Sequence, residues 1–357
     1  MALNFEFTEE QKDLKKKVYN LAKKLEYLIE PCDRDSVTPW PLIEEMGRQN
    51  WITPFVPVQY GGPGKGAIEF GIITEELSRA GFMGPNPMAG TAKMLLLAGT
   101  EEQKKAFLPD LCSGKVLASG LISEHNAGTN WDLMKTTAVK RKNTYILNGE
   151  KNHINYATEA GIFRVVAKMD KGPTIFMFRV DRNKPGLSCK KTEPIGLRME
   201  PLADVFFQNY EIPAESLLGE EGQAVDIFQR QFAINRIGNA SRLLGISRGA
   251  LEVAIEYAKK REVKGRMVTD YQGIRWIVAE LYWKIETATL MRDKAAWKVD
   301  RGEDAALEVA MAKVAAASAA EEVTSKIFSL TGAWGLYREQ PFERFWRDAM
   351  TGKVGGG

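Results

Sequence analysis

The spacing of hydrophobic residues changes twice along the chain. In the first third, apolar side chains recur every three to four residues, which is typical of helices with one buried face. From about residue 118 the pattern becomes short β-prone runs separated by polar turns, and after about residue 225 the helical spacing returns. This order predicts three consecutive units: a helical domain at 1–117, a β-barrel-like domain at 118–225 and a helical bundle at 226–357.

Capping signals support the first helical unit. Thr8 and Thr100 are each followed three residues later by a glutamine, which is the pattern of a capping box. Between these two signals, the Gly61–Gly64 cluster breaks the helical pattern. One apolar stripe after Thr8 consists of Leu14, Val18, Leu21 and Leu25. We therefore expect several helices joined by glycine-rich turns.

The middle unit contains five β-prone runs. Polar clusters at Lys140–Asn143, Asp170–Gly172 and Asn183–Gly186 predict turns between runs. Alternating short strands and turns favour a compact and mostly antiparallel sheet. The predicted strands are Thr136–Val139, Tyr145–Leu147, Phe163–Ala167, Thr174–Phe178 and Val205–Phe207.

The hydrophobic spacing in the last unit predicts long helices. An alanine-rich segment at Ala305–Ala320 can pack closely against a neighbouring helix. No glycine-rich Gly-x-Gly-x-x-Gly turn links a strand to a helix, so a dinucleotide-binding Rossmann fold is disfavoured. The fold class that we predict is α+β multidomain. The clearest helical stripe is Ile274, Ile277, Leu281, Ile285 and Ala288.

Composition is that of an ordinary globular protein. The 357 residues carry a net charge of +3, with 44% hydrophobic and 27% charged residues. This near balance of charge argues against nucleic acid as a partner. The longest apolar runs are much shorter than the roughly 18 residues that a membrane span needs. We expect a cytoplasmic protein with no membrane partner.

Cysteine and histidine counts limit the chemistry. Cys32, Cys112 and Cys189 are far apart, so they predict neither a disulfide framework nor a zinc site. His125 and His153 are the only histidines, too few for a multi-histidine metal centre. We therefore expect no metal, and chemistry that relies on carboxylates, lysines or an organic cofactor.

Several short strings occur in a characteristic order and spacing. They are Leu121–Glu124 with Gly128–Asn130, Leu147–Lys151, Asn235–Gly238, Tyr257–Arg261 and Phe345–Ala349. Together these strings resemble the acyl-CoA dehydrogenase family of flavoproteins. The resemblance implies a helical domain, a β domain and a four-helix bundle. It also implies FAD, an acyl-CoA substrate oxidised at its α and β carbons, an electron acceptor such as an electron-transfer flavoprotein, and a homotetramer or dimer.

The same resemblance implies a set of FAD-binding residues. Without the family, the first of these are also typical of a serine- and glycine-rich strand end, and Arg261 of a solvated helix end. Where the family usually has an aromatic residue and a hydroxyl at the flavin, this chain has His153 and Asn155; Lys264 and Ser329 also depart from the family pattern. The implied cofactor residues are Leu121, Ser123, Gly128, Thr129, His153, Asn155, Arg261, Gln272, Thr331, Gly332 and Ala333.

The customary catalytic base is missing. Counting from Arg347, the family position of the glutamate is Gly356, and the alternative position, directly before Arg236, is Asn235. Neither side chain can abstract a proton, although a positioned base is worth a factor of about a hundred to ten thousand in rate. The resemblance implies that Thr91, Thr129 and Arg236 contact substrate. It assigns Glu124 a structural role.

Three interpretations stay open at this point. The enzyme acts on an unusual acyl group, which is cyclic, already unsaturated or carries a leaving group. Alternatively, it works as an enoyl-CoA reductase, or like relatives that eliminate sulfinate. In the third interpretation it is a catalytically silent subunit that binds FAD or CoA.

Overall fold

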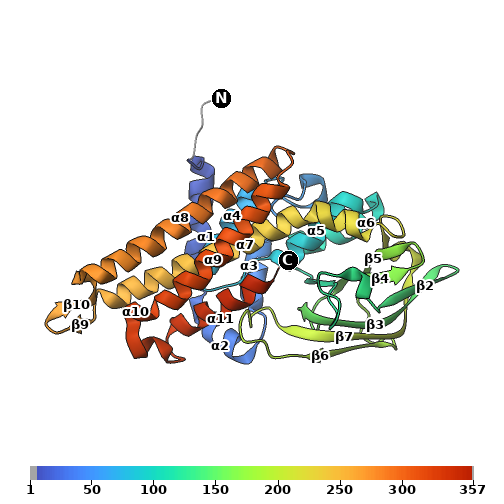
Figure 1. Cartoon of the computed structure of the whole chain (residues 1–357). Helices are drawn as coiled ribbons and strands as arrows, with labels where there is room; N and C mark the ends of the chain where they lie inside the picture. The colour runs from blue at the N-terminus through green and yellow to red at the C-terminus, as the bar shows by residue number, and fades with distance from the viewer. Residues whose placement is uncertain (1–5, 356–357) are drawn as a thin grey trace.

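The computed structural model describes residues 6–355, and its strands gather at one end of several long helices (Figure 1). Thr8 and Thr100 both form the predicted capping boxes, each accepting the N–H of the glutamine three residues on at 3.2 Å. The first unit consists of α1 (Glu9–Lys24), α2 (Ile29–Asp35), α3 (Trp40–Arg48), α4 (Ala67–Arg79), α5 (Asn86–Ala98) and α6 (Glu101–Cys112), with short 3₁₀ turns at Glu26–Leu28 and Val58–Tyr60.

The middle unit is one eight-stranded sheet. Its order is β6-β7-β3-β2-β4-β5-β8, and β1 pairs with β4. The pairings are antiparallel except that β1 runs parallel to β4 and β2 joins β4 by one parallel bridge, so the predicted sheet is mostly antiparallel as expected. The strands are β1 (Ala118–Leu121), β2 (Thr137–Arg141), β3 (Thr144–Asn155), β4 (Ile162–Met169), β5 (Gly172–Arg179), β6 (Leu187–Lys191), β7 (Leu202–Pro213) and β8 (Leu217–Leu218).

The last unit is the predicted helical bundle. Its central helix, α7, contacts both α4 and α5 of the first unit and α8, α9 and α11 of the bundle. A small hairpin of β9 and β10 follows α7 and lies, in Figure 1, at the end of the long helices opposite the main sheet. The elements are α7 (Ala224–Ala258), β9 (Glu262–Val263), β10 (Arg266–Met267), α8 (Gln272–Asp300), α9 (Ala306–Lys326), α10 (Phe328–Thr331) and α11 (Pro341–Val354).

The strands of the middle unit agree largely with the β-prone runs of the sequence. Four of the five predicted β-prone runs lie within strands, and the fifth, Thr136–Val139, begins one residue before β2. The strands that were not predicted are β1, β6, β8, β9 and β10. The three cysteines are free thiols. Within residues 6–355 no group of three or more metal-ligating side chains gathers, and none of the helices in that range is long and apolar enough to cross a membrane.

Candidate active site

The face between α5 and α7 brings polar side chains together around Gly90. Asn235 donates its amide N–H to Oε1 of Gln231 at 3.0 Å. A Cβ at Gly90 would lie 2.8 Å from Asn235 Oδ1 and 3.1 Å from Gln231 Nε2, so only glycine leaves these amides their present room. Gln231 is fully buried, and its Nε2 has no hydrogen-bond acceptor among the described residues. The position that the resemblance assigns to the alternative base therefore holds a half-buried amide, hydrogen-bonded to the buried amide of Gln231.

The end of the chain approaches the same stretch of α7. The carbonyl of Gly355 accepts a 2.7 Å hydrogen bond from Asn239, which lies one turn beyond Asn235. Arg236 is half-buried, with its guanidinium 5.0 Å from the centre of the Phe232 ring. Gly356, the other base position, lies outside the described residues. The residue that precedes it, Gly355, contacts Asn239, one helical turn along α7 from Asn235.

Two residues assigned to the substrate occupy different environments. Thr91 is fully buried, and its hydroxyl donates to the carbonyl of Pro87 one turn earlier in α5 at 3.0 Å. Thr129 is exposed in the loop after β1, as is Gly128. The Thr91 hydroxyl is thus already used inside its own helix, whereas the Thr129 hydroxyl is accessible.

The residues assigned to the flavin ring sit where β1 and β3 meet. Leu121 ends β1 and is fully buried, while the carbonyl of Ser123 accepts from the N–H of Asn152 at 2.8 Å. His153 is exposed and lies in an irregularity of the β3–β7 pairing, with φ of +58°. Its backbone N–H points to the Asp204 carboxylate at 3.3 Å. This irregularity turns the imidazole out of the sheet.

A hydrogen bond and an ion pair connect Asn155 to helix α7 of the bundle. Its amide donates to Glu200 at 2.9 Å, and Glu200 in turn pairs with Arg242 of α7 at 2.5 Å. Both charged groups are buried, and burial raises the pKa of Glu200 despite the opposing charge of Arg242. One N–H of Asn155 is therefore committed to positioning the strand on α7, and the rest of the amide is available for a ligand.

Glu124 is committed to structure. Its carboxylate accepts from Lys151 Nζ at 2.8 Å and from the N–H groups of Lys135 and Thr136 at 2.7 and 3.1 Å. Burial opposes ionisation of Glu124, but these donors outweigh it and lower its pKa. Burial lowers the pKa of Lys151 to about 8, although the hydrogen bond that Lys151 donates to Glu124 acts in the opposite direction. A carboxylate with three donors is a poor proton acceptor, so Glu124 does not replace the missing base.

A second group of cofactor residues forms around Arg261. Its Nη1 donates to the carbonyl of Thr331 at 2.6 Å and to the Tyr257 hydroxyl at 3.1 Å. Gly332 has φ of +61°, and a Cβ there would stand 3.2 Å from the same Nη1. The structure thus brings together Arg261, Thr331 and Gly332, which are far apart in the sequence. Ala333 is exposed beside them in the chain, and Gln272 is exposed at the start of α8.

The two groups of cofactor residues lie apart in a single chain. Asn155 is tied through Glu200 to Arg242, whereas Arg261 follows the far end of α7, next to the β9–β10 hairpin (Figure 1). At 1.5 Å per helical residue, the segment of α7 between them spans about 25 Å. The two groups of residues that the resemblance assigns to FAD are therefore separate in a single chain, and we call each of them a predicted half-site.

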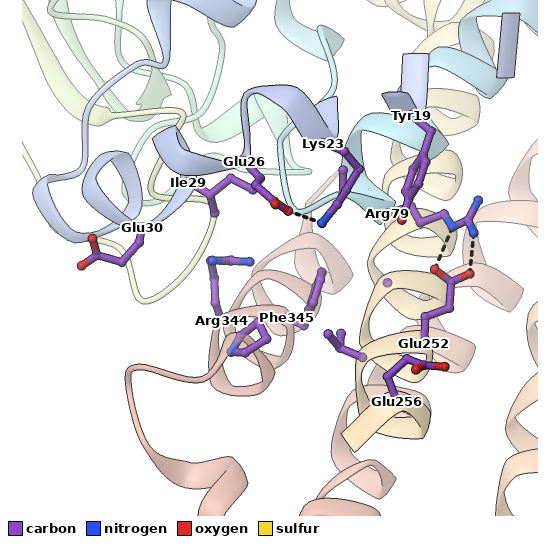
Figure 2. Close-up of a pocket in the computed structure, with 14 residues that line it drawn as sticks. Tyr19, Lys23, Glu26, Ile29, Glu30, Arg79, Glu252, Glu256, Arg344 and Phe345 are labelled. Carbon is purple, nitrogen blue, oxygen red and sulfur yellow. Dashed lines mark hydrogen bonds and ion pairs between the residues drawn. The ribbon is translucent and has the colours of Figure 1, made fainter. Parts of the chain in front are cut away.

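A cavity of about 460 Å³ lies elsewhere, between α1, α4, α7 and α11. Figure 2 shows that charged side chains surround it, with ion pairs between Lys23 and Glu26 and between Arg79 and Glu252. None of the predicted site residues lines it. This cavity is distinct from the candidate active site.

The sequence reasoning missed two buried polar residues of the α5–α7 face, Arg164 and Gln231. The available signal for Arg164 was a charge in the middle of an apolar strand, Ile162–Ala167.

Comparison with known proteins decides the family. Three models match in order: the N-terminal domain of acyl-CoA dehydrogenase at residues 8–115, the middle domain at 119–210 and the C-terminal domain at 222–357. The chain belongs to the acyl-CoA dehydrogenase family. The family resemblance stated from the sequence is thereby confirmed.

Individual relatives cover nearly the whole chain. An acyl-CoA dehydrogenase of Bacillus subtilis is 32% identical over 97% of this chain and 94% of its own length. A subunit of the caffeyl-CoA reductase–Etf complex of Acetobacterium woodii is 30% identical over 96% of this chain and 93% of its own. The structure of butyryl-CoA dehydrogenase from Megasphaera elsdenii aligns with a TM-score of 0.94 at 30% identity, covering 99% of this chain and 96% of that one.

These matches confirm the predicted fold of this acyl-CoA dehydrogenase homologue: a helical domain, a β domain and a C-terminal helical domain. Members of the family are FAD-dependent oxidoreductases that act on acyl-CoA thioesters, and the relatives include both dehydrogenases and reductases. The chain is therefore an oxidoreductase of this flavoenzyme family.

Proposed function

We propose that this protein binds FAD and acts at the α and β carbons of an unusual acyl-CoA, one whose reaction does not need a carboxylate at either customary base position. The observation that carries the proposal is the hydrogen-bonded amide pair of half-buried Asn235 and buried Gln231, with Asn235 at the alternative base position that the resemblance assigns on α7. An amide can donate and accept hydrogen bonds but does not take up a proton near neutral pH. Suitable acyl groups are cyclic, already unsaturated or equipped with a leaving group.

The residues present fit FAD. Arg261, beside the backbone of Thr331 and Gly332, offers a guanidinium to a pyrophosphate in a place that only glycine keeps open. At the other half-site, Ser123, Thr129, His153 and Asn155 provide polar groups for a flavin ring. Bound FAD supplies a two-electron acceptor for a hydride from the β-carbon.

The separation of the half-sites supports an oligomer. Each FAD would take its flavin-side contacts from one subunit and Arg261 from another. A stripe of large apolar side chains, spaced by seven residues along α8, is also open to solvent, and it continues on α9 at Leu307, Met311 and Val314. Exposed apolar surface of this kind favours burial against a second copy. The α8 stripe is Trp276, Trp283, Leu290 and Trp297, which are 67%, 55%, 54% and 49% exposed.

The reverse reaction is a second candidate, favoured by the relative from a caffeyl-CoA reductase–Etf complex. Reduction of an enoyl-CoA ends with protonation of the α-carbon. Water can supply that proton, so an amide at Asn235 is less of an obstacle in this direction. An electron-transfer flavoprotein is the redox partner that we propose in either direction.

Anaerobic flavin spectroscopy tests the proposal. We expect the purified protein to carry FAD and to behave in light scattering as two or four subunits. Saturated, cyclic and unsaturated acyl-CoAs are then added to oxidised protein, and enoyl-CoAs to dithionite-reduced protein. Bleaching by an unusual acyl-CoA supports the first function, and reoxidation by an enoyl-CoA the second. FAD-loaded protein that reacts with none of them would instead be the silent subunit.

A further inference from the structure

A buried arginine without a carboxylate lies beside this amide pair. Arg164, the third residue of β4, is 4% exposed. Its Nη1 donates only to the thioether sulfur of Met94 on α5, at 3.3 Å, and its Cζ lies 5.4 Å from the centre of the Phe228 ring on α7. Within residues 6–355, the guanidinium forms no ion pair with a carboxylate, and its Nε has no acceptor.

Such a cation is costly for the fold. Burying an unpaired charge forfeits its hydration and gains nothing in return, so buried charges are normally paired. Burial alone lowers the pKa of Arg164 to about 10, which still leaves the side chain charged at neutral pH. The strand therefore keeps a positive charge between α5 and α7 that no described residue neutralises.

The neighbouring unpartnered groups converge on the same place. A Cβ at Gly90 would lie 3.7 Å from Arg164 Nη1 and within 3.1 Å of Asn235 and Gln231. Gln231 Nε2 is a second buried donor without an acceptor. On the other side, a Cβ at Gly120 of β1 would stand 2.3 Å from Arg164 Nη2, so glycine is needed for the guanidinium to reach this position. The Arg164 guanidinium and the Gln231 amide are thus two buried donors that lack acceptors among the described residues and lie next to Asn235. An anion bound there would satisfy both donors.

We propose that Arg164, assisted by Gln231, binds a carboxylate at the far end of the acyl group, so that the substrate is the CoA thioester of a dicarboxylic acid. This rests on the proposed function, because it places the acyl group between α5 and α7. A guanidinium presents paired N–H groups that match the two oxygens of a carboxylate. The phosphates of CoA do not suit this position, because they lie at the opposite end of the substrate from the reacting carbons.

The test compares matched thioesters on the FAD-loaded oligomer. Succinyl-, glutaryl- and adipyl-CoA are paired with butyryl-, pentanoyl- and hexanoyl-CoA, and dissociation constants are measured by calorimetry. A charge-assisted hydrogen bond corresponds to about a ten- to hundredfold change in affinity. We expect at least one dicarboxylic thioester to bind tighter than its neutral counterpart by about that factor.

Variants assign that preference to the guanidinium. Arg164→Met should abolish the preference and leave the affinity for the neutral thioester nearly unchanged, while Arg164→Lys retains part of it. The control is Arg179→Met on the adjacent strand β5, where the side chain is half-exposed and already paired with Asp110 at 2.6 Å. This control removes the same charge and should retain the full preference.

The outcomes separate the two proposals. Equal binding of charged and neutral thioesters by the unmodified protein overturns the carboxylate site but leaves the acyl-CoA function standing. Failure of all six thioesters to bind overturns both. If Arg164→Met lowers turnover of charged and neutral thioesters equally, the guanidinium serves the reacting carbonyl instead, and the tail site is wrong. Should Arg164→Met fail to fold, Gln231→Leu must still reduce the preference, or the proposal fails.

Discussion

Two buried arginines in this protein differ in the hydrogen-bond acceptors that surround their guanidinium groups. Arg292, in the bundle, is 1% exposed and pairs with Glu75 at 2.6 Å, with Asp293 at 2.6 Å and with the Ser241 hydroxyl at 2.7 Å. Arg164, between α5 and α7, is almost equally buried and, among residues 6–355, has only a thioether sulfur as acceptor. The fold can therefore supply carboxylate and hydroxyl acceptors to a buried guanidinium, as it does for Arg292. Where it does not, the missing partner points to a ligand.

The two environments also differ in how they tie the molecule together. Glu75, on α4, receives Arg292 from α8 and also Arg248 from α7 at 2.7 Å. This cluster, which we call the Glu75 cluster, therefore joins the first unit to the bundle. Arg164 contacts β1, α5 and α7, but it forms no ion pair that joins these elements within residues 6–355. The first arrangement serves structure, and the second keeps a polar site open between three elements.

The largest effect is expected for Glu75→Gln. It leaves Arg292 and Arg248 without their shared carboxylate, and breaking a buried pair in this way costs about 3–5 kcal/mol. Urea unfolding should show this loss, whereas Arg164→Met should leave stability unchanged or raised, because it removes an unpaired charge. A stable Glu75→Gln protein together with an unfolded Arg164→Met protein would reverse the comparison.

The cost of Glu75→Gln should also depend on pH. Burial opposes ionisation of Glu75, but the charges of Arg292 and Arg248 outweigh it and lower its pKa from 4.5 to about 2. A depressed carboxyl pKa contributes stability that is present above the unfolded value of 4.5 and lost as pH falls towards 2. The difference in unfolding free energy between the two proteins should therefore shrink between pH 5 and pH 3. A constant difference over that range would mean that the carboxylate is not ionised in the fold.

Asn235→Glu should introduce the missing acid into the open site. A positioned base is worth a factor of about a hundred or more, so we expect flavin bleaching by a simple saturated acyl-CoA to accelerate by about that factor. The new carboxylate would also lie near Arg164 and should weaken the preference for a dicarboxylic thioester. Asn235→Gln is the control, because it keeps a neutral amide and should do neither. Gly356→Glu tests the other base position in the same assay.

Much of the fold could be predicted because its signals are local. Thr8 and Thr100 each cap a helix through a glutamine three residues away, and β-prone runs such as Phe163–Ala167 lie in strands. The four residues of β1 gave no signal of their own, since this strand is defined by its pairing with β4, about forty residues later.

The site could be predicted only in part. Arg261 and Gly332 were assigned through the family, and their contact across 70 residues of sequence is visible only in three dimensions. Asn155 stands at a family position that usually carries a hydroxyl, and its hydrogen bond to Glu200 could not be foreseen from the sequence. Arg164 was missed because the sequence shows that a charge is present in a strand but not whether it has a partner. The absence of a partner is a property of the folded neighbourhood.

The smallest expected effect is that of Gly120→Ala, which acts on the position of the Arg164 guanidinium. The added Cβ would stand 2.3 Å from Nη2, at the flexible end of that side chain, so the guanidinium must move. Overpacking a rigid core typically costs about 1–3 kcal/mol, and a side-chain end that can shift should keep the loss of stability at or below the lower limit. The preference for a dicarboxylic thioester should nevertheless fall severalfold. The control is the same change in the Arg164→Met background, where no guanidinium remains to be displaced, and a double-mutant cycle isolates the coupling. If Gly120→Ala reduced binding equally in both backgrounds, the methyl group would be acting on the pocket wall rather than on Arg164, and Gly120 would have no part in positioning the cation.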